Sequence, residues 1–439
     1  MSELTKKKFD YTWVIVACCF LMVGTSLGFC SSPKQLFVEA VTEVLDIPRS
    51  VYALNTTFRY AAVAAINLFF GSILMKLGVR KMIALGFASL VLSNILYAVA
   101  QSVWVIYAGA VCLGIGIALV GSTTVSYIIH SRCKNNVGTV LGFCLAANGF
   151  CGAIAMKVLA PIIGDHTVNP NGYRNAYWLV TAILTVVGIL VTILYKNAPG
   201  GESAANAKKQ KKARGNVWEG FAFDEAKRKS YFIPTAVCLF LIGFVLSGIN
   251  GISLVHMKAN VGAANQDFIV SVWAFHSLAL MFSKFITGFI YDKRGLRVCF
   301  LICQGTAVIV MTALALVNES TLGLVLAVVY AIFSSLALPM ETVGVSLAVG
   351  DIFGSHDYAK ILGLMTSLVS VGFAVGDPIM NAVYDLMGSY TVAIWIAVAA
   401  IATASVGFQI IITVAHKDRE KTLAERAAAA AAAENTVVS

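Results

Sequence analysis

"GFIYDKRGLR", residues 288–297, decides the fold, because a related segment, "GSILMKLGVRK" at residues 71–81, lies about half the chain earlier. Both segments begin with glycine, turn on a second glycine and end in basic residues. The first glycine lets two helices approach closely, and Gly78 and Gly295 permit a tight turn. One turn repeated at this distance indicates that the chain consists of two similar halves.

The composition places the chain in a lipid bilayer. Of its 439 residues 59% are hydrophobic and only 12% are charged, whereas soluble domains carry about twice that charge. Twelve apolar stretches reach the length of a spanning helix, near residues 12–36, 50–76, 80–100, 103–130, 135–162, 175–195, 231–256, 268–291, 297–317, 321–350, 359–386 and 390–415. The predicted fold class is an all-α integral membrane protein with twelve transmembrane helices.

The positions of the basic residues predict the orientation. Most of the 32 Lys and Arg residues lie in the two terminal segments and in the loops on the same side of the membrane as the termini. Because basic residues near helix ends stay on the cytoplasmic side, both termini are predicted to be cytoplasmic. We expect a multi-pass protein of the plasma membrane, a bacterial inner membrane, whose net charge of +10 reflects topology and not binding of nucleic acid.

The polar segments divide the chain. Residues 196–230 form a basic cytoplasmic linker between an N-terminal bundle, residues 1–195, and a C-terminal bundle, residues 231–415. After the last span, residues 416–439 begin as a charged helix and continue as an alanine run without a face to bury. This segment is interpreted as a loosely ordered cytoplasmic tail.

The sequence contains no pattern typical of an enzyme. The ten cysteines are scattered without metal-ligand spacing, no nucleotide-binding loop follows a strand, and no nucleophile and base are placed together. We therefore expect no cofactor and no metal. Without a nucleotide-binding loop, the energy for any transport across the membrane must come from a concentration or ion gradient.

The paired turns resemble the signature loop of the major facilitator superfamily, G-x-x-x-D-[RK]-x-G-x-[RK]. The second copy matches at Gly288, Asp292, Lys293, Gly295 and Arg297, and the first at Gly71, Lys76, Gly78, Arg80 and Lys81. Met75 stands where the family has the aspartate. The resemblance implies two six-helix bundles around a central cavity, with these loops as gating elements, and bundles that rock to expose a midplane site. Asp292 can pair with the neighbouring bases or with the start of another helix.

Charges inside the spans indicate the kind of cargo. Each costs about 2.5–3.5 kcal/mol at the bilayer centre, so each must pair or face water. The internal charges are the bases Lys34, Arg59, Lys157 and Lys284 and the acids Glu341 and Asp377. The excess of positive charge means that a cavity containing these groups favours anions.

Lys284 is the first candidate for binding an anion. His276 and Lys284 are two helical turns apart and share a helix face. Lys284 either binds a carboxylate or forms an internal ion pair with Asp377 or Glu341. His276 either joins the substrate site or is a buried structural histidine.

Three further segments resemble the monocarboxylate transporter and oxalate/formate antiporter branches of the superfamily. Lys34 follows Pro33 as in the "F…PK…F" ending of that branch, Lys284 lies eight residues before Asp292, and the pattern "GDP…YD…GSY" begins at Gly376. The resemblance implies that Lys284 and Lys34 bind a carboxylate. From periodicity alone, Lys34 could equally reach the lipid headgroups.

Arg59 is a further candidate cation, and two acids are candidates for proton coupling. Asp377 adjoins Pro378 and Gly376 in a helix suited to line a cavity, and it either carries a proton or pairs with Lys284 or Arg59. Glu341 either carries a proton or stabilises helix packing.

The predicted function is secondary transport of a small organic anion, most simply proton-coupled symport of a monocarboxylate by alternating access. An exchanger of carboxylates or dicarboxylates is the alternative, and a sensor on the same fold is a minor one. The expected partners are the anion, protons and membrane lipid, with a monomer as the expected state.

Overall fold

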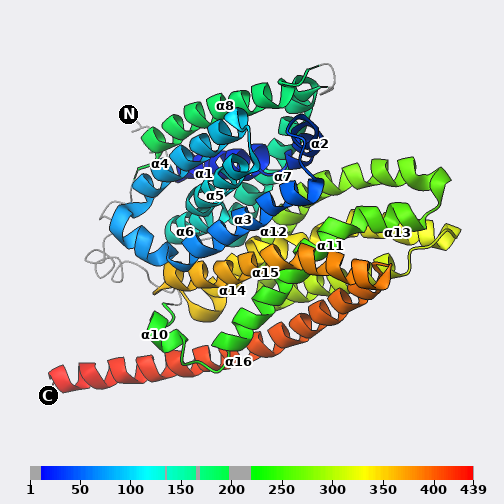
Figure 1. The fold of residues 1–439 in the computed structure, drawn as a ribbon. Coiled ribbons are helices and arrows are strands. Elements are labelled where there is room, and N and C mark those ends of the chain that lie inside the picture. The colour runs from blue at the N-terminus through cyan, green and yellow to red at the C-terminus, as the bar shows by residue number, and fades with distance from the viewer. Residues whose placement is uncertain (1–10, 134–135, 165–168, 197–218, 439) are drawn as a thin grey trace, which may run out of the picture.

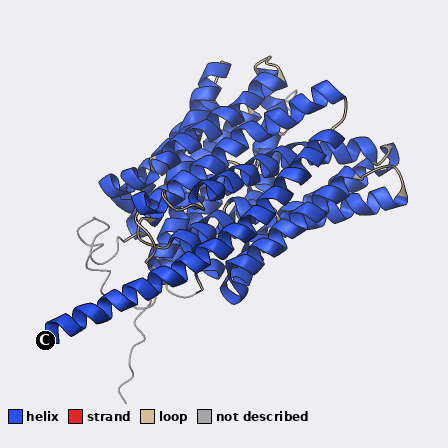
Figure 2. Ribbon diagram, turned by 90° about the horizontal axis from the view of Figure 1, so that it is seen from below, coloured by secondary structure: helices blue, strands red, loops and turns tan. Residues whose placement is uncertain are grey.

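The computed structural model describes residues 11–133, 136–164, 169–196 and 219–438. Over these ranges the regular elements are all helical (Figure 2). The N-terminal half contains α1 (Thr12–Val23), η1 (Gly24–Phe29), α2 (Lys34–Val44), α3 (Arg49–Leu68), α4 (Phe70–Val99), α5 (Val103–Val120), α6 (Ser122–Arg132), α7 (Val137–Ile163) and α8 (Gly172–Leu194). Most of the predicted linker, residues 197–218, lies outside the described ranges.

The C-terminal half repeats this helical organisation. It contains α10 (Phe223–Ala226), α11 (Phe232–Asn260), η3 (Ala263–Asn265), α12 (Gln266–Ala315), α13 (Thr321–Phe333), η4 (Ser334–Leu336), η5 (Leu338–Glu341), α14 (Val343–Phe353), α15 (Tyr358–Met387) and α16 (Thr391–Val438). In the described residues, ten helical stretches are long and apolar enough to cross a membrane. Helix α3, and the division of α12 at Gly295, complete the twelve predicted spans.

Two glycines make the turns that fold long helices back on themselves. Gly78 in α4 has φ 73° and Gly295 in α12 has φ 78°, a left-handed conformation that glycine adopts without steric cost. Each turn therefore separates two spans that follow each other directly in the sequence. The end of the molecule that carries Gly78 and Gly295 is called the turn face below, and the sequence predicts that it is cytoplasmic.

The two halves lie side by side, with α3 against α15 and α7 against α12 (Figure 1). Small residues make these contacts close. A Cβ atom at Gly142 would lie only 2.4 Å from the carbonyl oxygen of Lys284, and one at Gly363 only 2.4 Å from that of Asn67. The backbones of the two halves therefore touch along these helix pairs.

The first predicted span, residues 12–36, is not one continuous helix. Helix α1 continues into the π-helical turn η1, the chain bends at residues 30–33, and α2 begins at Lys34 after Pro33. Proline has no N–H to donate and fixes its own backbone angle, so it suits the entry of a new helix. The tenth predicted span, residues 321–350, is likewise interrupted by η4 and η5, where Pro339 lies.

The expectation of a loosely ordered tail is wrong. Helix α16 continues without a break to Val438 and projects from the body of the molecule (Figures 1 and 2). Alanine has the highest intrinsic helix propensity, which favours helix in the run after residue 426 even without a buried face.

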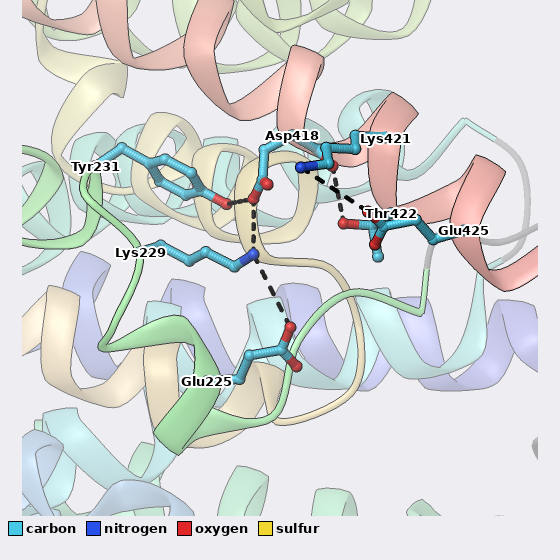
Figure 3. Close-up of polar contacts among 7 residues, drawn as sticks. All are labelled: Glu225, Lys229, Tyr231, Asp418, Lys421, Thr422 and Glu425. Carbon is cyan, nitrogen blue, oxygen red and sulfur yellow. Dashed lines mark hydrogen bonds and ion pairs between the residues drawn. The ribbon is translucent and has the colours of Figure 1, made fainter.

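Polar contacts also tie the first turns of this extension to the rest of the protein (Figure 3). The carboxylate of Asp418 accepts a hydrogen bond from Tyr231 Oη at 3.0 Å and lies 2.9 Å from Lys229 Nζ. At the end of α14, Asp351 lies 2.7 Å from His416 Nε2 and 3.7 Å from Arg419. The sequence analysis missed these contacts, because their partners lie far apart in the chain.

Candidate functional site

A cavity lies inside the N-terminal half. It has about 480 Å³ of empty space, part of which is open to solvent. Its lining comes from the end of η1 and the bend after it, and from α2, α3, α4, α5 and α8. The lining residues are Phe29, Cys30, Lys34, Phe37, Tyr52, Asn55, Thr56, Arg59, Asn94, Tyr97, Leu113, Tyr177 and Val180.

Two cations line this cavity. Arg59 on α3 is only 7% exposed, and its Nη1 donates a hydrogen bond to Ser31 Oγ at 2.7 Å. Its guanidinium also lies over the Tyr60 ring, 4.5 Å from the centroid. Lys34, at the start of α2, is near enough to Arg59 for the two charges to repel each other. These cations thus share one space, which is unfavourable until an anion enters it.

No carboxylate belongs to the described lining of this cavity. Lys34 is instead attracted by Asp377 on α15, in the other half of the molecule. The described residues contain no direct ion pair for Lys34 or Arg59. The structure therefore places Lys34 toward the cavity and the opposite bundle.

Hydrogen bonds and stacked rings make the rest of the cavity wall rigid. Tyr97 Oη donates to Asn55 Oδ1 at 2.8 Å, and Asn94 Nδ2 donates to the carbonyl oxygen of Leu90 at 2.9 Å. The rings of Phe37 and Tyr177 stack with centroids 4.2 Å apart. The sequence analysis did not single out these residues, although asparagine within apolar spans is itself a signal of a polar interior.

Lys284 does not line this cavity. It is 1% exposed on α12, next to the contact with α7, and its main electrostatic partner is Glu341 in η5. Within the described ranges its ammonium group makes neither a hydrogen bond nor a direct ion pair. Glu341 also lies near Tyr60 of the N-terminal half. The charges of Lys284 and Glu341 thus attract each other and partly compensate without direct contact, beside the boundary between the halves.

The contacts of the Asp377 carboxylate come from residues of its own, C-terminal half. Its Oδ1 accepts a hydrogen bond from Asn381 Nδ2 at 3.1 Å, and Asn381 Oδ1 in turn accepts one from Tyr390 at 2.9 Å. The carboxylate lies against Gly251 of α11, where a Cβ atom would be 2.2 Å from Oδ1. The lysine whose charge acts on Asp377 is Lys34, whereas the sequence analysis had considered Lys284 or Arg59 as its partner.

His276 lies in a different part of the C-terminal half. Its Nδ1 is 3.1 Å from the carbonyl oxygen of Ala331 and 3.2 Å from Ser334 Oγ. It lines a second, smaller cavity together with Asn250 and Tyr330. His276 thus shares no cavity with Lys34 and Arg59 in the described structure.

Three of the predicted gating residues, Gly71, Gly288 and Asp292, lie where the halves meet at the turn face. Asp292 accepts hydrogen bonds from the backbone N–H groups of Gly138 and Thr139, at 2.9 and 2.6 Å, at the start of α7. Gly288 packs directly on Gly138, and in the first copy Gly71 packs on Lys360. The halves are therefore in contact at this face, through a carboxylate in the second copy and through packing in the first.

The Arg80 side chain and the backbone at Arg297 also contact neighbouring helices. Arg80 Nε donates to the carbonyl oxygen of Thr192 at 2.9 Å, and Gln409 Nε2 donates to that of Arg297 at 3.3 Å. Lys157, the remaining internal cation of the sequence analysis, is exposed on α7. The described residues contain no group of three or more side chains suited to bind a metal.

Comparison with known proteins identifies the family. The family model of the Major Facilitator Superfamily matches residues 14–335 and 235–438. A solved structure of the E. coli fucose:proton symporter is similar with a TM-score of 0.69 at 13% identity, covering 91% of this chain and 99% of that one. The proton:xylose symporter XylE, bound to 6-bromo-6-deoxy-D-glucose, gives a TM-score of 0.71 at 14% identity, covering 90% and 94%.

Identities this low establish the fold alone. The family match extends over nearly all of the described helices, and the solved structures share their arrangement along nearly the whole chain. The chain is a multi-pass membrane transporter of the Major Facilitator Superfamily.

Proposed function

We propose that this transporter carries a small organic anion, a monocarboxylate, together with a proton. One observation carries the proposal: Lys34 and Arg59 face the same cavity, whose described lining contains no carboxylate. Two like charges in a confined space of low dielectric attract an anion and repel a cation. An uncharged sugar would leave both charges uncompensated.

Arg59 is proposed as the principal contact of the carboxylate. Its planar guanidinium can hold both carboxylate oxygens, and its contacts with Ser31 and Tyr60 fix its position before the substrate arrives. Lys34 is proposed to add a second positive charge. This assignment transfers the leading role from Lys284, which the sequence analysis favoured, to the cations that line the cavity.

Asp377 is proposed to couple the proton to the anion. While Asp377 is ionised, it attracts Lys34 away from the substrate; once protonated, it releases Lys34 to bind the carboxylate. Anion and proton then bind together, and a monocarboxylate moves with no net charge. Glu341 beside Lys284 is the second candidate proton carrier, and His276 is proposed only as a contact for a larger substrate.

Contacts at the turn face support alternating access. With Asp292 on the start of α7 and Gly71 on Lys360, the halves close the molecule at one end. We propose that this end is cytoplasmic, and that rocking of the halves separates these contacts to release the anion.

The test is uptake of radiolabelled lactate into proteoliposomes under an imposed inward proton gradient, for the wild type and Asp377→Asn. We expect the gradient to drive accumulation in the wild type. In Asp377→Asn, exchange of external for internal lactate continues but the gradient drives no accumulation, because a neutral amide cannot take up the proton.

Two results would overturn this function. Wild-type uptake that depends on internal carboxylate and ignores the gradient would make the protein an exchanger. Saturable uptake of an uncharged sugar without uptake of any carboxylate would show that the cations do not select the substrate.

A further inference from the structure

We propose that the transported anion carries a hydroxyl group beside its carboxylate, and that Asn94 accepts a hydrogen bond from this hydroxyl. The inference deepens the proposed function and rests on it. It assigns a substrate class, the short hydroxycarboxylates, and a residue that distinguishes them from plain carboxylates.

Asn94 is an unusual residue for its place in the fold. It lies in the second half of α4, is 3% exposed, and lines the same cavity as Lys34 and Arg59. A buried amide at a membrane-spanning position is costly unless its polar atoms are satisfied. Asn94 therefore requires partners for both ends of its amide.

The structure defines which end of the amide faces the cavity. Nδ2 donates to the backbone carbonyl oxygen of Leu90 at 2.9 Å. A carbonyl oxygen can only accept, so the nitrogen must be the atom on that side. Nδ2 also lies 3.8 Å from Cys30 Sγ, a weak acceptor.

The other end of the amide, Oδ1, is an acceptor. Among the residues that the structure describes, none donates a hydrogen bond to it. Because Asn94 lines the cavity, Oδ1 is the group that it can offer to a bound molecule. When a ligand displaces water from the cavity, an acceptor in this position requires a donor from the ligand.

The neighbouring cations define what kind of donor fits. A carboxylate satisfies Arg59 and Lys34, but it has only acceptor atoms and cannot satisfy Oδ1. An ammonium group would donate, but the two cations repel it. A hydroxyl donates without charge, so a carboxylate that also bears a hydroxyl satisfies both parts of the cavity.

The experiment compares pairs of acids that differ only by this hydroxyl: lactate with propionate, and glycolate with acetate. Proteoliposomes are assayed for the uptake of each radiolabelled acid and for its competition by the partner acid. We expect the wild type to prefer the hydroxylated member by about tenfold or more, because a site built to bond a hydroxyl discriminates against the analogue that lacks it.

Asn94→Leu, of similar size, should reduce this preference to about twofold or less while propionate uptake persists, because the acceptor is lost. Ser89→Ala is the matched control on the same helix. Ser89 Oγ donates to the carbonyl oxygen of Cys112 at 2.7 Å and does not line the cavity, so the preference should remain.

Equal uptake of lactate and propionate by the wild type would overturn the inference and leave carboxylate transport intact. A preference that survives in Asn94→Leu would also overturn it, by removing Asn94 from the discrimination. If Asn94→Leu does not fold, the same loss of preference is sought in Asn94→Ala, and the wild-type comparison of lactate with propionate still tests the inference. Absence of uptake for all four acids would instead refute the proposed function.

Discussion

The two halves share one architecture but compensate their internal charges differently. In the N-terminal half, Lys34 and Arg59 line a cavity whose described lining contains no acidic residue. In the C-terminal half, the charge of Lys284 is partly compensated by that of Glu341. The same difference recurs in the paired turns, since Asp292 bonds the start of α7 while Met75 occupies the equivalent place. The comparison teaches that one half supplies free positive charge and the other supplies the carboxylates.

The largest effect is expected when the positive charge of the N-terminal cavity is removed. Arg59→Gln should lower lactate uptake roughly 10- to 100-fold, because the carboxylate loses its charge-assisted hydrogen bonds. Lys157→Gln, on the exposed face of α7, is the matched control and should transport like the wild type. Initial uptake rates in proteoliposomes, normalised to inserted protein, measure both. Wild-type rates in Arg59→Gln would show that the anion binds elsewhere.

The second-largest effect is expected at Lys284, whose charge, unlike that of Arg59, is partly compensated by a nearby acid, Glu341. Lys284→Gln leaves Glu341 without its cation and should lower uptake by about tenfold, because a buried charge that loses its partner is destabilising. Adding Glu341→Gln should restore much of the activity, since the pair is then neutral. Uptake by the double variant is the measurement. A double variant no better than Lys284→Gln would give Lys284 a direct role with the substrate.

A smaller effect is expected at the turns. Asp292→Asn weakens the hydrogen bonds to Gly138 and Thr139, so hydrogen exchange of these two amides should accelerate about fivefold. Met75→Asp adds a carboxylate to the first copy, where Gly71 packs on Lys360 near the start of α15, and it should slow exchange in that turn. Mass spectrometry of the exchanged protein measures both. Unchanged exchange in Asp292→Asn would show that packing alone holds the halves together.

The smallest effect concerns the extension of α16. Asp418→Asn weakens the contacts with Lys229 and Tyr231 and should speed hydrogen exchange around residues 227–232 by about two- to threefold. Glu425→Gln is the control, because Glu425 pairs with Lys421 at 3.9 Å on the exposed surface. Equal hydrogen exchange around residues 227–232 in both variants would mean that the extension is helical but is not attached to this segment through Asp418.

Much of the fold was readable from the sequence. The repeated glycine turn and the twelve apolar stretches depend on local residue types, which act wherever the chain folds. The orientation inferred from the basic residues stays a prediction. The breaks at Pro33 and Pro339 and the helical extension of α16 were not foreseen. At Pro33 and Pro339, a proline interrupts a run that is long and apolar enough for one continuous span. In α16, the helix propensity of alanine prevails although the run has no face to bury.

The candidate site was only half readable. The sequence identified the charged residues within the spans, because charges there are rare. It could not determine which charges meet, since Lys34 and Asp377 belong to different halves and the approach of the halves fixes their pairing. Asn94 was overlooked for a different reason: the sequence does not show that it lines the cavity, nor that its Nδ2 bonds Leu90 one helical turn earlier and leaves Oδ1 without a described donor.

Modification of Cys30 is the measurement that tests the central claim most directly. Cys30 lines the cavity of Lys34 and Arg59, and Cys112 on α5 lies outside it. The two thiols are treated with a negatively charged and a positively charged methanethiosulfonate, with and without lactate, and quantified by mass spectrometry.

A positive cavity that binds anions predicts that Cys30 favours the negative reagent relative to Cys112, and that lactate slows the modification of Cys30 alone. Faster reaction of Cys30 with the positive reagent, or modification indifferent to every carboxylate tested, would contradict an anion site in the N-terminal half.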